Sequence, residues 1–284
     1  MFYIAQFDAE TNRSVMNNVG MNFKTVIEGH SGGVLSVAYN HDSTKVISGL
    51  GDKTIKEWDL STGTCLVTLK GHSRGVESVA YNHDSTKVIS GSYDNTIKEW
   101  DLRTGTCLVT LKGHSRGVLS VAYNHDSTKV ISGSDDRTIK EWDLSTGTCL
   151  VTLKGHSGSV MSVAYNHDST KVISGSYDKT IKEWDLSTGT CLVTLEGHSG
   201  SVWSVAYNHD STKVISGLGD KTIKEWDLST GTCLVTLEGH SSSVMSVAYN
   251  HDSTKVISGS GDNTIKEWDL RTGTCLVTFE RAFK

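Results

Sequence analysis

The chain has 284 residues and a formal net charge of −5, and a chain of this length buries roughly three-quarters of its unfolded surface when it folds. The mild negative charge argues against a protein that binds nucleic acid or an anionic membrane surface. No apolar run approaches the ~18 residues of a membrane span, and the start, MFYIAQFDAE, lacks the basic region of a secretory signal, so we expect a cytoplasmic protein.

A unit of 42 residues repeats six times without an insertion. It first runs from Gly29 to Lys70 (GHSGGVLSVAYNHDSTKVISGLGDKTIKEWDLSTGTCLVTLK), and the later copies begin at Gly71, Gly113, Gly155, Gly197 and Gly239. A fixed period of this size is typical of stacked or radially arranged units. The residues common to all copies therefore predict the scaffold, and the columns that differ are the best indication of function.

The residues before the first unit carry weak copies of parts of it. Residues 4–8 (IAQFD) align with residues 55–59 (IKEWD), and residues 23–30 (FKTVIEGH) align with residues 65–72 (CLVTLKGH). We therefore predict an additional outer strand over residues 23–27. Residues 1–22 are expected to be an N-terminal extension that contains a decayed remnant of a further unit.

Each unit alternates short runs rich in β-branched residues with clusters of turn residues, and nothing in it shows the 3.6-residue period of a helix. In the first unit these runs predict strands over residues 34–39, 45–48, 54–58 and 65–69. The turn Asn40–Ser43 is expected to cap itself through its Asn or Asp side chain. An all-β, four-stranded antiparallel meander results, and neighbouring units must cover its faces.

The repeated GH pair, the turn Asp and the terminal Trp-Asp pair make the unit resemble a WD40 repeat. The resemblance covers Gly29 to Glu280 and implies a β-propeller of six four-stranded antiparallel blades, here a single domain over residues 23–284. The near-identity of the copies is most similar to the recently amplified propellers of fungal immune-like receptors and of some bacteria. The GxxxxGK[ST] loop of an accompanying NTPase module does not occur in the sequence.

The resemblance also implies a buried hydrogen-bond chain in every blade, in which each polar group satisfies its neighbour. Its members would be a His, a Ser, an Asp and a Trp of the same unit. In chain order these sets are His30, Ser48, Asp52 and Trp58; His72, Ser90, Asp94 and Trp100; His114, Ser132, Asp136 and Trp142; His156, Ser174, Asp178 and Trp184; His198, Ser216, Asp220 and Trp226; and His240, Ser258, Asp262 and Trp268.

The predicted ring contains one outer strand more than six blades need. Either residues 23–27 or Cys275–Phe279 completes blade six, and the other strand is displaced. We expect six closed blades, and the alternative is a seven-bladed ring with a partial blade built from residues 1–27.

Two repeated columns depart from what the fold alone demands. The family usually carries an aliphatic residue where this chain has Glu57 and its equivalents. We expect this Glu at a solvated rim or paired with a nearby Lys, and the alternative is a buried acidic ring that binds cations. The six Cys, one per unit, match neither a disulfide framework nor a zinc site, and we expect reduced thiols.

The repeated Ser, His and Asp do not predict an enzyme. Nucleophilic catalysis needs an exposed Ser beside a base and an oxyanion site, whereas these sets occur equally in six units and resemble the scaffold. The second group of His, in the NHD turns, is expected to lie too far apart between blades to share a metal ion. We therefore expect no catalytic residues, no cofactor and no metal.

Of the 42 columns, 33 are identical in all units and nine vary. Seven of the nine map to the d–a loops and b–c turns, which lie at the same end of an antiparallel meander. This concentration favours a diversified binding surface. Its predicted partner-binding residues are Leu35, Glu77, Tyr93, Leu119, Asp135, Met161, Tyr177, Trp203, Met245, Arg74, Arg116 and Arg137.

Charge is also segregated around this end. Lys70, Lys112 and Lys154 enter units two to four, whereas Glu28, Glu196 and Glu238 enter units one, five and six. Aromatic and Met side chains surrounded by charge suit a protein or peptide partner. We expect a monomeric, non-catalytic binding scaffold.

Two alternative functions remain. One is a structural protein that assembles through the propeller. The other is a substrate receptor, because Asp94 to Arg103 and Trp268 to Arg271 are similar to the box by which some WD40 proteins dock on the adaptor of cullin-type ubiquitin ligases.

Overall fold

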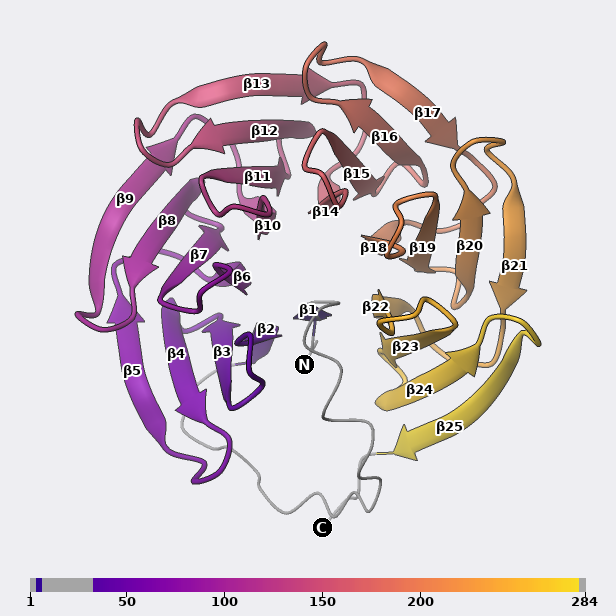
Figure 1. Cartoon of the computed structure of the whole chain (residues 1–284), viewed down its shortest axis with the longest axis horizontal. Helices are drawn as coiled ribbons and strands as arrows, with labels where there is room; N and C mark the ends of the chain where they lie inside the picture. The colour runs from indigo at the N-terminus through magenta and orange to yellow at the C-terminus, as the bar shows by residue number, and fades with distance from the viewer. Residues whose placement is uncertain (1–3, 7–32, 281–284) are drawn as a thin grey trace.

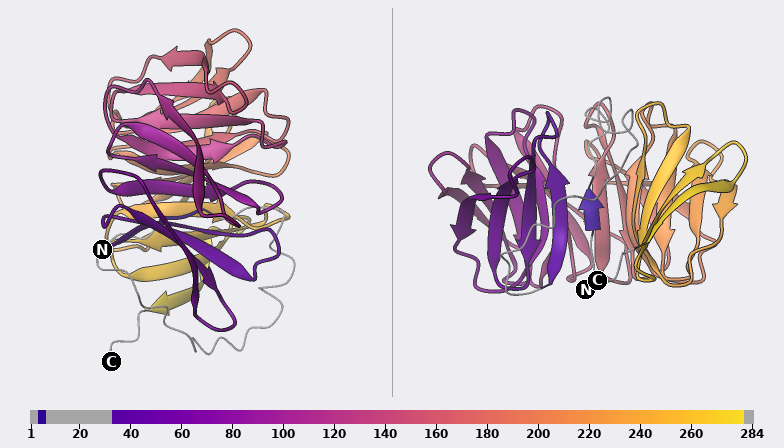
Figure 2. Two further views of the ribbon diagram at one scale, coloured as in Figure 1. Left: turned by 90° about the vertical axis from the view of Figure 1, so that its left-hand side faces the viewer. Right: turned by 90° about the horizontal axis from the view of Figure 1, so that it is seen from below.

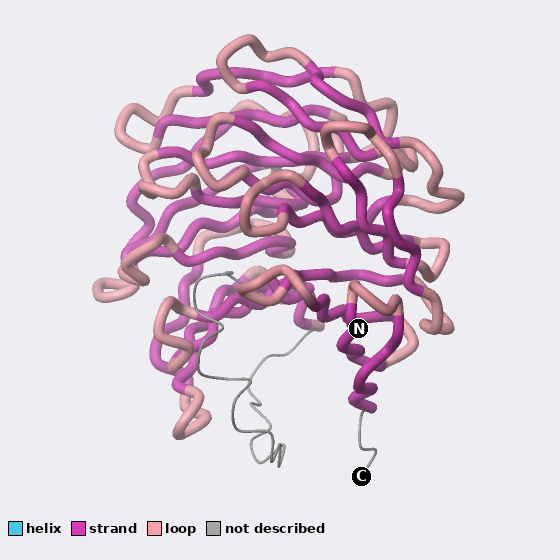
Figure 3. Tube along the Cα trace, turned by 45° about the vertical axis from the view of Figure 1, so that its right-hand side comes forward, coloured by secondary structure: helices cyan, strands magenta, loops and turns pink. Residues whose placement is uncertain are grey.

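The computed structural model describes residues 4–6 and 33–280, and every regular element in these ranges is a β-strand. The strands form six sheets arranged around a central axis (Figure 1). Seen from the side, the loops lie along both rims of the disc (Figures 2 and 3). The fold is the six-bladed propeller that the repeat predicted.

Each blade uses four consecutive strands. Blades one to three contain β2 (Val34–Tyr39), β3 (Lys45–Leu50), β4 (Thr54–Asp59) and β5 (Cys65–Lys70); β6 (Val76–Tyr81), β7 (Lys87–Ser92), β8 (Thr96–Asp101) and β9 (Thr106–Lys112); and β10 (Val118–Tyr123), β11 (Lys129–Ser134), β12 (Thr138–Asp143) and β13 (Cys149–Lys154). Blades four to six contain β14 (Val160–Tyr165), β15 (Lys171–Ser176), β16 (Ile181–Asp185) and β17 (Cys191–Leu195); β18 (Val202–Tyr207), β19 (Lys213–Leu218), β20 (Ile223–Asp227) and β21 (Cys233–Leu237); and β22 (Val244–Tyr249), β23 (Lys255–Ser260), β24 (Thr264–Asp269) and β25 (Thr274–Glu280).

Within a blade the strands pair in antiparallel order from the axis outward. In blade three, for example, Val121 lies opposite Ser132, and Ile131 lies opposite Glu141. The loop that enters a blade and the turn between its second and third strands lie on one rim, which we call the top rim. The turns that follow the first and third strands lie on the other, the bottom rim.

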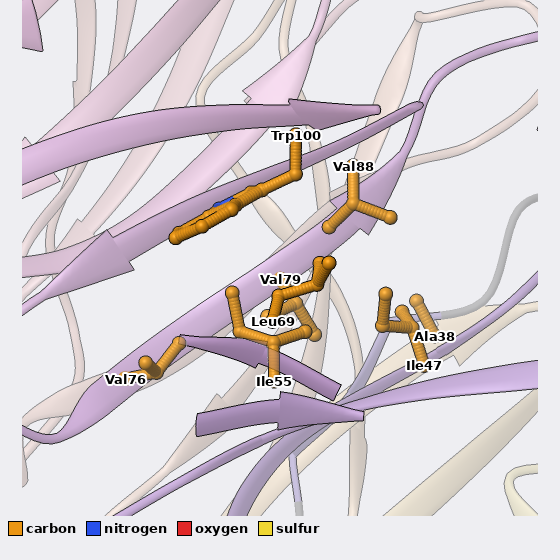
Figure 4. Packing of buried hydrophobic residues seen from close by; sticks show 8 residues of the cluster. All are labelled: Ala38, Ile47, Ile55, Leu69, Val76, Val79, Val88 and Trp100. Carbon is orange, nitrogen blue, oxygen red and sulfur yellow. The ribbon is translucent and has the colours of Figure 1, made fainter. Parts of the chain in front are cut away.

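The hydrophobic core lies between neighbouring blades. Ile47, Ile55 and Leu69 of blade one pack against Val76, Val79, Val88 and Trp100 of blade two (Figure 4). A Cβ on Gly49 would lie 2.9 Å from Cγ1 of Val76, so the invariant Gly of the second strand allows the blades to approach this closely. Equivalent clusters occupy the next four junctions.

The repeated Glu connects neighbouring blades. Glu57 is 4% exposed; its carboxylate accepts a hydrogen bond of 3.0 Å from the Tyr81 hydroxyl of blade two and lies 3.8 Å from Lys45 Nζ. Of the two arrangements expected for this Glu, the pair with a Lys is present and the solvated rim is not, because the side chain is buried. Burial, together with the adjacent carboxylate, raises the pKa of the Tyr81 hydroxyl, which stays a donor.

Replacing Tyr165 by Phe should destabilise the protein by about 1–2 kcal/mol, because buried Glu141 loses a hydrogen bond of 3.1 Å. Chemical denaturation would measure the change in the free energy of unfolding. Tyr177→Phe is the control, since its ring is 49% exposed and an exposed substitution costs within about 0.5 kcal/mol. Equal effects of the two substitutions would contradict the role of the Tyr–Glu bond.

The junction between blades six and one differs from the other five. β1 (Ile4–Gln6) pairs in parallel with β2 and also lies against β22, so it stands between the two innermost strands (Figure 1). A Cβ placed on Gly259 meets nothing within 4 Å, and Ile265 is 44% exposed whereas Ile55 is 1% exposed. In the described part of the chain, the end blades therefore do not close the ring by packing face to face.

This arrangement decides which strand completes blade six. β25 pairs with β24, so the C-terminal strand completes the blade. Residues 4–6, which lie in the segment expected to hold a decayed remnant of a further unit, pair with the axial edge of β2, which would otherwise leave its backbone groups unpaired. Residues 23–27, predicted as an additional outer strand, lie outside the described residues.

Candidate functional site

A hydrogen-bond chain fixes the top loop of each blade to its sheet. In blade two, His72 Nδ1 lies 2.8 Å from Asp94 Oδ2, and His72 Nε2 lies 2.8 Å from Ser90 Oγ. The Trp100 indole donates to the same Ser90 Oγ at 2.8 Å. The same four residue types meet in blades three, four and six. In blade one Trp58 donates to Ser48, and His30 lies outside the described residues.

In blade two, the electrostatics of this hydrogen-bond chain keep His72 neutral and Asp94 ionised. Burial lowers the pKa of the His72 imidazole and outweighs the effect of Asp94. Burial opposes ionisation of the Asp94 carboxyl, but hydrogen bonds from Thr96, Ser73 and His72 still hold its pKa below the usual range. A neutral His donates from Nδ1 and accepts at Nε2, so each member is satisfied. These repeated Ser, His and Asp residues therefore work as scaffold.

In blade five this hydrogen-bond chain is partly broken. His198 Nδ1 lies 3.9 Å from Asp220 Oδ2 and has no hydrogen-bond partner among the described residues. In blades two, three, four and six a Ser before the turn accepts a 3.1 Å hydrogen bond from the Asp backbone N–H. Leu218 replaces that Ser in blade five and offers no acceptor, so the turn Asp is held less closely.

Leu218→Ser should restore the His198–Asp220 contact. Burial lowers the pKa of His198 to about 4, and a hydrogen bond to ionised Asp220 should raise it. NMR titration of the imidazole would show this rise. The reciprocal Ser176→Leu substitution in blade four should loosen His156 from Asp178, and an unchanged pKa of His198 in Leu218→Ser would contradict this account.

A shallow groove crosses the top rim between blades two and three. Arg74, Tyr93, Asn95, Arg116 and Asp135 line it. The Tyr93 ring is 44% exposed and lies over Gly117, where a Cβ would approach Tyr93 Cδ1 to 2.5 Å. Arg74 Nη1 donates to the Tyr93 carbonyl at 3.5 Å, and Arg116 Nη1 lies 3.5 Å from Asp135 Oδ2. The groove thus presents an aromatic face between two guanidinium groups.

A second aromatic group lies on the top rim between blades four and five. The Tyr177 and Trp203 rings meet edge to face, with centroids 5.2 Å apart and planes inclined by 69°. Tyr177 is 49% exposed, Trp203 is half-buried, and the Trp203 indole lies next to Gly219. Tyr177 and Trp203, both among the predicted partner-binding residues, are thus brought together, whereas Met245, another of those residues, is buried, with 6% exposed.

The column that includes Trp203 lines the mouth of a central channel with a volume of about 370 Å³. Glu77, Leu119 and Met161 are further members of this column in the lining, and Leu119 is 8% exposed. Burial raises the pKa of Glu77 to about 7. Leu35 is half-buried. These side chains are less available to a large partner than the two exposed Tyr residues.

The predicted charges occupy the top rim. Lys70, Lys112 and Lys154 are exposed where the chain enters blades two to four, and Arg137 is exposed beside the blade-three turn. Glu196 and Glu238 are exposed at the entries to blades five and six, and Glu28 lies outside the described residues. The residues at which the chain enters the blades are therefore basic for blades two to four and acidic for blades five and six, although Lys221 is exposed beside the blade-five turn.

On the bottom rim, the NHD turns bring together His side chains that were expected to lie far apart. Five successive pairs of imidazole rings, from His41–His83 to His209–His251, have centroids 5.3–5.7 Å apart. The expectation that these residues lie too far apart to share an ion was therefore wrong, because the first turn of each blade lies close to the axis. Within the described ranges, no group of three or more His, Cys, Asp or Glu forms a metal site.

The NHD turns cap themselves as predicted. Asn40 Nδ2 donates to Asp42 Oδ1 at 2.7 Å, and Asn40 Oδ1 accepts from the Lys45 backbone at 2.8 Å. All six Cys are exposed and unpaired with one another. Among the described residues, no helix has the length and apolar character to cross a membrane.

The six-bladed ring with its His–Ser–Asp–Trp chains defines a β-propeller built from one repeated blade. The family model for the WD domain, G-beta repeat, matches residues 21–59, 63–101, 105–143, 147–185, 189–227 and 231–269. The chain therefore belongs to the WD40 repeat family.

Two named proteins are similar to short segments of this chain. The chain is 55% identical over 38 residues to vegetative incompatibility protein HET-E-1 of Podospora anserina, which is 13% of this chain and 3% of that protein. It is 40% identical over 43 residues to mitochondrial division protein 1 of Malassezia globosa, which is 15% of this chain and 6% of that protein. The chain thus spans only a small part of the length of these relatives.

Proposed function

We propose that this propeller is a non-catalytic scaffold that binds a protein or peptide through its top rim. Propellers of the WD40 family are typical protein-interaction scaffolds. The observation that carries the proposal is the exposure of Tyr93 and Tyr177 on the rim where the repeats differ, within a blade sequence that is otherwise nearly invariant. Exposed aromatic side chains next to Arg are typical of interface anchors.

The charge pattern supports a partner of mixed character. A peptide that places acidic residues over Arg74 and Arg116 and basic residues toward Glu196 and Glu238 would match both sides of the rim. Such complementarity sets the orientation of a partner and its rate of association more than its affinity. The Tyr93 groove and the Tyr177–Trp203 pair would then supply the apolar contacts.

Capture of partners from a cell extract would test the proposal with a fourfold variant, Arg74→Gly, Tyr93→Gly, Arg116→Gly and Asp135→Gly. All four replacements are the residues of the first unit at the same columns, so the blade sequence tolerates them. The double variant Arg103→Ser and Arg271→Ser on the bottom rim is the matched control, because other units carry Ser there.

The proposal predicts that the fourfold variant loses partners that the native chain and the control retain. Loss confined to the control would instead favour docking on the ubiquitin-ligase adaptor, since Arg103 and Arg271 are both exposed. A mass in solution that corresponds to an oligomer resistant to dilution would favour the assembly function over a monomeric scaffold.

A further inference from the structure

The imidazoles of the bottom rim form a continuous series that the fold itself does not require. The contribution of each NHD turn to the next blade comes from its backbone. The His41 N–H donates to Ser85 Oγ at 2.9 Å, and the four following pairs repeat this bond at 2.9–3.0 Å. Any residue that carries a backbone N–H would make this bond, so the structural role of the turn leaves the imidazole side chain unexplained.

The ring nitrogens of these residues are accessible. His41, His83, His125, His167 and His209 are exposed and border the central channel. Their ring contacts are with one another, and across the described part of the chain no hydrogen bond to the ring nitrogens of these five occupies their lone pairs. A neutral imidazole with a free nitrogen is the commonest protein ligand of transition metals.

The spacing of the rings matches two imidazoles on one ion. Zinc lies about 2.0–2.1 Å from a His nitrogen, which places the centroids of two rings in a tetrahedral arrangement roughly 5 Å apart. The centroid distances are 5.3, 5.6, 5.7, 5.7 and 5.4 Å around the arc, with planes inclined by 48–55°. Binding would require each ring of a pair to direct one nitrogen toward a common point.

The type of ligand, rather than the surrounding charge, selects the ion, because each of these turns has a Lys beside its Asp. An Asp follows each of these His in the sequence, and its carboxylate accepts hydrogen bonds inside the turn, such as those from Thr44 and Asn40 to Asp42. The bottom rim thus carries one carboxylate per blade next to the imidazoles. Imidazole ligands suit zinc, copper and nickel, whereas magnesium and calcium prefer oxygen ligands.

We propose that neighbouring NHD histidines bind a divalent transition-metal ion between adjacent blades, with two protein ligands per ion and water in the remaining positions. Because both ligands belong to neighbouring blades, a bound ion connects the blades at the rim opposite the partner-binding surface. The proposal is independent of the function assigned to the top rim.

Two triple variants of the full chain isolate the effect of adjacency. His41→Asn, His209→Asn and His251→Asn together leave His83, His125 and His167 as three consecutive residues. His83→Asn, His167→Asn and His251→Asn together leave His41, His125 and His209, with no two in neighbouring blades. Both variants keep three rim His, all six His of the GH pairs and all six Cys, so any metal bound by isolated imidazoles or thiols contributes equally to both.

Titration calorimetry with Ni²⁺ alone, and separately with Zn²⁺ alone, would measure the affinities in a buffer that does not bind metals. Joining two ligands in fixed proximity strengthens binding by about 10²-fold or more. We expect the variant with consecutive His to bind Ni²⁺ about 10²-fold more tightly than the variant with alternating His, and to gain the larger increase in Tm. Equal Ni²⁺ affinities in the two folded variants would overturn the proposal. It would also be overturned if a variant with all six NHD His replaced by Asn bound Ni²⁺ as tightly as the native chain.

Discussion

Trp184→Ala should destabilise the propeller by about 3–5 kcal/mol, the range for removing a large buried aromatic side chain. Trp184 is 1% exposed and packs between blades with Val160, Val163, Val172 and Leu153. Its indole also donates to Ser174 Oγ at 2.8 Å, and its ring meets the His156 ring at a centroid distance of 5.9 Å. The substitution therefore leaves a cavity and removes a buried hydrogen bond together.

Denaturant unfolding would measure this loss in the free energy of unfolding, and two further substitutions make the measurement specific. Asp178→Ala should cost about 3 kcal/mol, because it leaves buried His156 without its 2.8 Å partner. His167→Ala should cost less than about 0.5 kcal/mol in the absence of metal, because its side chain is exposed on the bottom rim. Similar losses for His167→Ala and Trp184→Ala would mean that the buried chain does not carry the stability assigned to it.

The scaffold could be predicted from the sequence because every blade repeats the same pattern of residues. Alternation in VLSVAY, the KVISG strand and the Trp-Asp pair fixed the order of strands, and six copies in register left few other arrangements. The position of the repeated Glu was harder to predict, because its Tyr partner comes from the next blade, 24 residues away in the chain. A one-dimensional pattern does not show which residues meet across a blade junction.

The candidate site was predicted in outline only. Columns that vary located the top rim, but Leu119 and Met245 are buried there, because the first strand of each blade runs along the channel. The bottom-rim His residues were expected to lie far apart because they belong to separate blades. The small radius near the axis nevertheless brings their rings together. Distance from the axis is set by the curvature of the ring, and no single unit encodes it.

The loosened chain of blade five affects the same region as the aromatic pair of the top rim. Leu218 removes the Ser that holds the turn Asp elsewhere, and the next residue, Gly219, lies against the Trp203 indole. Blade five therefore combines Trp203, the bulkiest side chain of the variable column at the head of the first strand, with the least tightly held of the fully described top loops. Such a loop can adjust to a partner at a smaller cost than its neighbours.

Trp203→Ala should weaken partner binding by about 2 kcal/mol, the effect of removing an interface anchor, which is roughly thirtyfold in Kd. The Trp203 ring is half-buried beside exposed Tyr177, so a partner that covers both rings would bury the remaining surface. Since Trp203 borders the channel mouth and is not part of the hydrophobic cluster between blades four and five, the free energy of unfolding should change by less than about 1 kcal/mol.

Titration of a captured partner against native chain and variant, with denaturation of both, would separate binding from folding. Trp203→Leu is the matched control for side-chain type, because the first and third units carry Leu at this column; it should keep the fold and lose most of the affinity, since Leu lacks the ring that meets Tyr177. Intact binding together with a large loss of stability in Trp203→Ala would show that this indole fills the channel mouth as part of the core. The binding surface would then lie over the Tyr93 groove of blades two and three.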